Sequence, residues 1–200
     1  MTYRFALSAL VGLGLLGHAG LARAEVTVGT FTLDGLSFIF FGDQQILLPE
    51  SGSFIRFHFG TPSADGSVPF TIAPADVSIT PVALPANGGT LDYTIASPAS
   101  GTIVPTADGR RISFTATVRA TLSGSHGAGE SYDYVMPFST ESAAANDAAG
   151  TQSVSVTGMR LVEGAWYGQL VGATTNRTNA FPEPGAAVYT VLSGQFDQIP

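Results

Sequence analysis

Apolar and polar residues alternate with a two-residue period along most of this chain. The clearest run covers residues 111–122, in which every second residue is apolar and those between are Arg, Ser or Thr. The apolar positions are Ile112, Phe114, Ala116, Val118, Ala120 and Leu122. Because successive side chains of a strand point to opposite faces, this pattern predicts a strand with one buried face and one hydrated face.

Shorter segments of the same kind predict further strands at 25–33, 36–41, 51–60, 90–96, 153–162, 166–172 and 187–196. Asp-Gly pairs at 34–35, 65–66 and 108–109 predict turns, since glycine tolerates positive φ, and the first pair predicts a tight hairpin. Alanines in 139–150 favour a helix, but Asn146, Asp147 and Gly150 favour a loop. We expect an exposed connection there.

This series of short strands predicts an all-β fold, and we favour a two-sheet antiparallel β-sandwich of immunoglobulin-like or jelly-roll type. Seven prolines between residues 62 and 105 indicate short strands at a sheet edge or strands that cross between sheets. A small outer-membrane β-barrel is the alternative architecture. It requires alternating segments of about 10 residues, whereas most segments here are shorter.

The N-terminus has the pattern of a secretory signal peptide. Arg4 precedes an apolar run over 5–16, and the Ala22-Arg23-Ala24 triplet is typical of a cleavage site. We expect residues 1–24 to be removed and residues 25–200 to form a single domain. The mature protein should be periplasmic or extracellular, without membrane insertion.

Charge and cysteine content narrow the function. Residues 25–200 hold six arginines, fifteen acidic residues and no lysine, which gives −9, and the whole chain has no cysteine. Nucleic-acid binding by counterion release needs a basic surface, so we do not expect it. Such a surface suits a divalent cation or a neutral partner such as a glycan. Thiol nucleophiles and cysteine-based metal sites are excluded.

Arg56 and His58 lie on the same side of the predicted strand 51–60. They form either a hydrated strand face or a ligand-binding site, and a site needs a carboxylate that orients the imidazole. His126 lies in a Gly/Ser-rich segment with Glu130 and Asp133 nearby. It belongs either to a flexible hairpin tip or to a metal site.

Trp166 and Tyr167 are neighbours in a predicted strand and should therefore point to opposite faces. One should pack in the core, while the exposed one could stack on a glycan or contact a protein. For calcium, the candidate ligands are Asp65, Asp108 and Asp147, because Asp-containing turns can supply oxygen ligands. The alternative interpretation is that they are plain turn residues.

These observations favour a secreted, non-enzymatic β-domain that builds a surface, matrix or appendage structure or binds a glycan or protein. Self-association could occur by strand addition at 25–33, which would be a free edge after cleavage. The alternative is a secreted hydrolase in which His58 or His126 meets two carboxylates. Such a hydrolase would lack a G-x-S-x-G nucleophile motif, because none occurs here.

Overall fold

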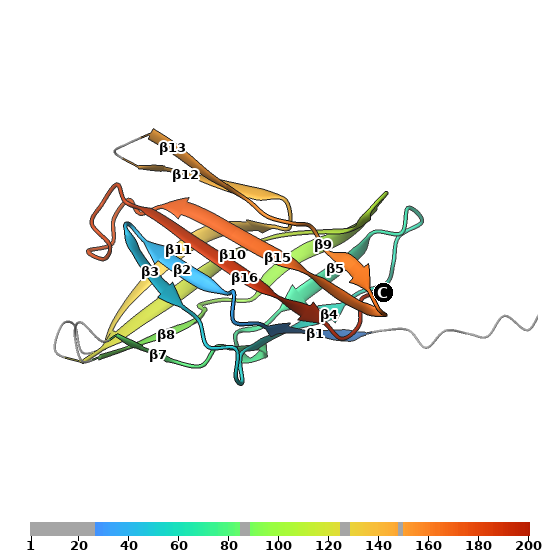
Figure 1. Cartoon of the computed structure of the whole chain (residues 1–200), viewed down its shortest axis with the longest axis horizontal. Helices are drawn as coiled ribbons and strands as arrows, with labels where there is room; N and C mark the ends of the chain where they lie inside the picture. The colour runs from blue at the N-terminus through green and yellow to red at the C-terminus, as the bar shows by residue number, and fades with distance from the viewer. Residues whose placement is uncertain (1–26, 85–88, 125–128, 148–149) are drawn as a thin grey trace, which may run out of the picture.

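The computed structural model describes residues 27–84, 89–124, 129–147 and 150–200. The chain is all-β, as predicted, but the predicted two-sheet sandwich is wrong. Eight antiparallel strands form a closed barrel (Figure 1). These strands are β1 (Val28–Leu33), β4 (Phe54–Phe59), β5 (Val68–Ile72), β9 (Ala99–Thr106), β10 (Gly109–Ser123), β11 (Glu130–Ser139), β15 (Ala165–Thr175) and β16 (Ala187–Phe196).

The barrel is an up-and-down meander, since each of the eight strands pairs with the next one along the chain. It closes where β1 pairs with β16, with Phe31 opposite Phe196. Thr30 and Asp197 extend this contact by two hydrogen bonds, from Thr30 N to Asp197 Oδ1 and from Asp197 N to the Thr30 carbonyl. β1 therefore has a hydrogen-bonded neighbour on both sides. The prediction that 25–33 forms a free edge is wrong.

The remaining elements are inserted between barrel strands. They are β2 (Phe38–Phe41), β3 (Gln44–Leu47), η1 (Pro74–Asp76), β6 (Val77–Ser78), β7 (Val82–Leu84), β8 (Gly89–Ile95), β12 (Ser142–Asp147), β13 (Gly150–Ser155) and β14 (Arg160–Val162). The β2–β3 hairpin lengthens the wall beside β16, and β8 does the same beside β10. β14 pairs with the first residues of β15.

Phenylalanine rings fill the barrel interior. Phe57 lies 4.9 Å from Phe70 and 4.8 Å from Phe196 between ring centroids, and Phe114 stacks on Phe138 at 4.8 Å. Space for these rings comes from inward-facing glycines. A Cβ atom on Gly101 would lie 2.6 Å from the Phe70 ring and 2.3 Å from the Ser113 carbonyl oxygen. The interior is thus a packed core, in which large and small residues alternate.

The sandwich prediction failed because the same alternation of buried and exposed residues serves both folds. Each strand in a sandwich or in a barrel has one core face and one outer face. The two folds differ in whether the first and last strands pair, and that contact joins residues far apart in the sequence. The alternation within single strands carries no information about it.

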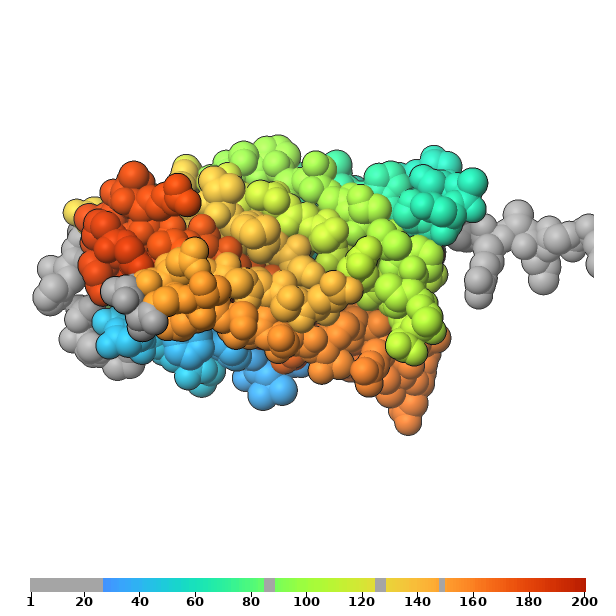
Figure 2. Space-filling model, turned by 90° about the horizontal axis from the view of Figure 1, so that it is seen from above, coloured from blue at the N-terminus to red at the C-terminus, as the bar shows by residue number. Residues whose placement is uncertain are grey.

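Residues 139–150 are also not the exposed connection that we predicted. β12 pairs with β13 to form a separate two-stranded ribbon, and Figure 2 shows this segment lying along the outside of the barrel. Ala145 is 5% exposed and packs with Ala173, Ala187 and Tyr189 of β15 and β16. The Tyr189 hydroxyl donates a hydrogen bond to the Gln152 carbonyl oxygen at 2.9 Å. Small alanine side chains let the ribbon approach the barrel closely.

Two local predictions also need correction. The Asp34-Gly35 turn joins β1 to β2, but these strands pair with other strands, so the turn is not a hairpin. Residues 153–162 form parts of β13 and β14 instead of one strand. The Asp108-Gly109 turn does join the paired strands β9 and β10. The predicted signal peptide lies outside the described residues.

Candidate functional site

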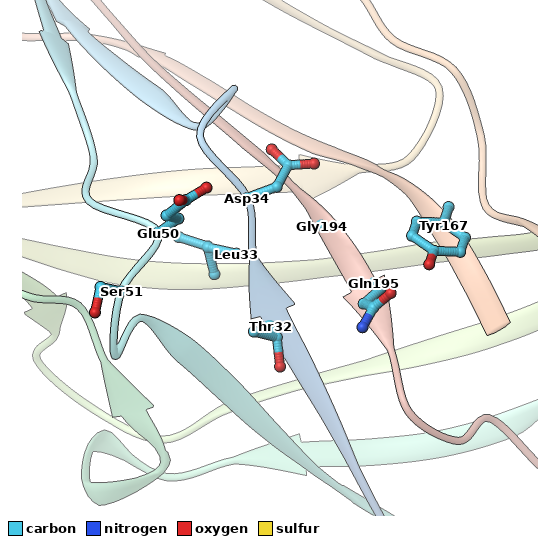
Figure 3. Close-up of a pocket in the computed structure, with 8 residues that line it drawn as sticks. All are labelled: Thr32, Leu33, Asp34, Glu50, Ser51, Tyr167, Gly194 and Gln195. Carbon is cyan, nitrogen blue, oxygen red and sulfur yellow. The ribbon is translucent and has the colours of Figure 1, made fainter.

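A groove of about 470 Å³ lies on the outer wall of the barrel, where β1, β16 and β15 run side by side (Figure 3). The loop that precedes β4 forms its other border. The lining residues are Thr32, Leu33, Asp34, Glu50, Ser51, Tyr167, Gly194 and Gln195. Most of these side chains are polar, and the groove is open to solvent along its length.

Four outward-facing side chains form a line across this wall, which we call the outer row: Thr32, Gln195, Tyr167 and Arg160. Strand register sets this line, because Thr32 lies opposite Gln195, Gln195 opposite Tyr167, and Tyr167 opposite Arg160. All four are exposed, and the Tyr167 side chain is 44% exposed. Figure 3 shows the first three side by side. Neighbouring strands are about 4.8 Å apart, so the row spans about 14 Å.

Two carboxylates border the groove beside the row. Asp34 Oδ2 accepts a hydrogen bond from Ser193 Oγ at 2.8 Å, and Asp34 Oδ1 accepts one from Leu36 N at 2.9 Å. These bonds fix the Asp34 side chain. Glu50 is exposed, and its carboxylate makes no hydrogen bond or ion pair with the described residues. The groove thus offers two carboxylate acceptors, the oriented Asp34 and the unrestrained Glu50.

Trp166 and Tyr167 face opposite sides of β15, as predicted. Trp166 is partly buried against the core, and the Arg110 guanidinium lies 5.4 Å from the centre of its ring. Tyr167 is the exposed member of the pair and lines the groove. Of the two aromatic candidates, only Tyr167 therefore presents its ring at the outer surface. Ligand binding by either residue remains a prediction.

Arg56 and His58 lie on the outer face of β4 and are exposed. The Arg56 guanidinium lies 4.6 Å from the centre of the Phe54 ring. His58 Nε2 lies 3.0 Å from Asp76 Oδ2, so one carboxylate does orient the imidazole. Burial raises the pKa of Asp76, but hydrogen bonds from His58 and the Ala73 backbone outweigh this and leave the pKa below 3.8.

A second groove, of about 620 Å³, runs beside His58 along β4, β5 and β9. Its polar side chains are His58, Thr71, Ser100 and Thr102. His58 lies opposite Thr71, and Thr71 lies opposite Ser100. Asp76 is the only carboxylate paired with His58 among the described residues. The hydrolase hypothesis requires two, and His126, its other candidate, lies outside the described residues.

Two of the three candidate calcium ligands lie in neighbouring turns at one end of the barrel, and the third lies apart from them. Asp65 is in the loop between β4 and β5, Asp108 is in the turn between β9 and β10, and Asp147 ends β12 in the ribbon. Asp65 Oδ1 accepts hydrogen bonds from Ser67 Oγ and Ser67 N, which lower the Asp65 pKa. Among the residues with defined placement, no three His, Asp or Glu side chains converge on one point.

Sequence reasoning found Tyr167 but missed Thr32, Asp34, Glu50 and Gln195. These side chains meet only because β16 lies between β1 and β15. The chain matches no protein-family model, no curated protein and no solved structure. In the described ranges, no helix is long and apolar enough to cross a membrane.

Proposed function

We propose that this protein is an exported saccharide-binding β-barrel whose ligand lies along the outer row. The observation that carries the proposal is the exposed Tyr167 ring. In the strand register Tyr167 lies between Gln195 and Arg160, and its side chain borders a groove with two carboxylates. A sugar ring presents a face of C–H groups and a rim of hydroxyls. An aromatic ring suits the first, and carboxylate, amide and hydroxyl groups suit the second.

The packed interior supports an outer-wall site. The barrels that hold a small ligand keep internal space for it, whereas the pocket between Phe114, Phe138 and Leu192 inside this barrel holds only about 20 Å³. This volume is comparable to a single water molecule. A ligand of several rings therefore fits the groove on the outer wall and not this internal pocket.

The outward-facing residues support a barrel surrounded by water. Outer-membrane barrels carry an apolar outer band and a polar interior. This barrel has the opposite arrangement, since β10 turns Arg111, Thr115 and Arg119 outward and Ile112, Phe114 and Val118 inward. The barrel fold is compatible with our alternative prediction, and the polar outer face of β10 gives no support to the membrane location that accompanied it. We retain export to the periplasm or cell exterior as part of the proposal.

The test is a screen of the purified protein against an array of neutral and singly charged oligosaccharides, followed by calorimetric titration of those that bind. Tyr167→Ala should weaken binding by about tenfold or more, because it removes the stacking surface. Tyr167→Phe should keep most of the affinity. Val135→Ala is the matched control, since Val135 is 63% exposed and lies on β11, away from the groove. Equal affinity of the native protein and Tyr167→Ala would overturn the proposal.

A further inference from the structure

A second polar pocket adjoins the outer row at its Arg160 end. It has a volume of about 180 Å³ and lies where β14 meets the start of β10. Its lining includes three arginines, two acidic residues and two threonines: Arg110, Arg111, Arg160, Asp108, Glu141, Thr106 and Thr140. Residues 25–200 contain six arginines and no lysine, so half of the basic side chains in this acidic chain line one small pocket.

The three arginines differ in the partners that their guanidinium groups already have. Arg110 donates a hydrogen bond to the Pro200 carbonyl oxygen at 3.3 Å and lies against the Trp166 ring. Arg111 pairs with Glu141 at 3.4 Å, and both side chains are about half exposed. Such a pair contributes little energy. Arg160 is exposed and makes no ion pair or side-chain hydrogen bond with the described residues.

Thr140 also lines this pocket. It is fully buried, and its Oγ1 accepts a hydrogen bond from Ile112 N at 3.1 Å. Within the described part of the chain, its hydroxyl hydrogen has no acceptor. A guanidinium carries five N–H donors in a fixed plane, which matches the oxygens of a carboxylate or a sulfate. The pocket therefore offers the unpaired guanidinium of Arg160, beside Arg111, whose ion pair with Glu141 is exposed to solvent and weak.

We infer that this pocket binds the anionic group of an acidic saccharide, so the ligand of the outer row carries one carboxylate or sulfate ester. The inference rests on the proposed function, because it assigns a direction to the ligand on that same wall. Asp34 and Glu50 border the opposite end of the row, where no arginine lines the groove, and would repel a second negative charge there. In the pocket, by contrast, three arginines outnumber the two acidic residues. The ligand thus has a neutral part over Thr32 and Gln195 and its charged unit beyond Tyr167, at Arg160.

The test compares three tetrasaccharides by calorimetric titration: a neutral one, the same chain ending in a uronic acid, and the same chain ending in a sulfate ester. We expect one of the charged ligands to bind about tenfold more tightly than the neutral ligand. A preference for the uronic acid would identify a carboxylate as the group bound, and a preference for the ester would identify a sulfate. The advantage should shrink as salt is raised, because exposed charges are screened.

Arg160→Gln should lower the affinity for the charged ligand by about tenfold and the affinity for the neutral ligand by much less, because only the charged ligand places an anionic group in the pocket. The matched control is Arg177→Gln, which removes the same charge from an exposed position in the loop between β15 and β16. Equal affinities for neutral and charged ligands would overturn this inference and leave the proposed function standing. Failure of all three ligands and of the whole array would overturn both.

Discussion

The inner and outer surfaces of the barrel differ in composition and in what they can do. On β4 the inward side chains are Ile55, Phe57 and Phe59, and the outward ones include Arg56 and His58. The inner surface is closed and packed with rings. The outer surface carries the grooves, the arginine pocket and the exposed tyrosine.

If the proposed function holds, this contrast separates stability from binding. The core is filled from the inner face, so Gln195 and Tyr167 on the outer face have no packing role in the barrel interior and remain available to a ligand. The proposed site then depends on strand register. Shifting β16 by one residue against β15 would turn Gln195 inward and break the outer row.

The largest expected effect is on the interior. Phe57→Ala should lower the free energy of unfolding by about 3–5 kcal/mol, because it leaves a cavity among Phe70, Phe114 and Phe196. Urea unfolding followed by circular dichroism measures it. Arg56→Ala, one residue earlier on the outer face, is the control and should cost under about 1 kcal/mol. Similar losses for both variants would contradict the division between the two surfaces.

An intermediate effect is expected where the ribbon covers the outer wall. Ala145→Asp places a charge in the small cluster that contains Tyr189. It should make docking of the ribbon onto the barrel less favourable by about 1–3 kcal/mol. Hydrogen exchange should then become faster in β12 and β13 and stay slow in β10. Ala144→Asp is the control, because Ala144 is exposed. If exchange in β10 also became faster, the ribbon would be part of the barrel's stability.

The smallest effect concerns His58 and Asp76. Asp76→Asn should lower the free energy of unfolding by about 0.5–1 kcal/mol at pH 7. The Asp76 pKa lies below its usual value of 3.8, so the native carboxylate stabilises the fold above that pH. This advantage is lost as the pH falls through the lower, folded-state pKa. The difference between native protein and variant should therefore be present at pH 7 and shrink at pH 3. A difference that grows in acid would contradict this assignment.

The sequence predicts individual strands well because alternation is local. Residues 111–122 lie within β10, and 166–172 lie within β15. It fails where the outcome depends on distant residues. The sequences of β1 and β16 do not reveal that the two strands pair through Phe31 and Phe196. The alanine-rich β12 has only a weak local preference for helix or loop, and its packing against the barrel decides its conformation.

The same limit applies to the candidate site. Trp166 and Tyr167 are adjacent in a strand and therefore face opposite sides. The sequence predicts that one of them is exposed but not which one, and the structure shows that it is Tyr167. Asp76 as the partner of His58 could not be predicted, because it comes from the short η1 turn 18 residues later. The position of Arg160 beside Tyr167 could not be predicted either. It depends on the pairing of β14 with β15, and the sequence of residues 153–162 predicts one strand and not the separate β14.

The pairing of β1 with β16 also determines the order of events during synthesis. The first barrel strand has no partner on one side until Phe196 has been made. Contacts between chain ends form late and slowly, because a long loop must close. The barrel can therefore close only after nearly the whole chain has been synthesised, and its first strand stays open to other partners until then.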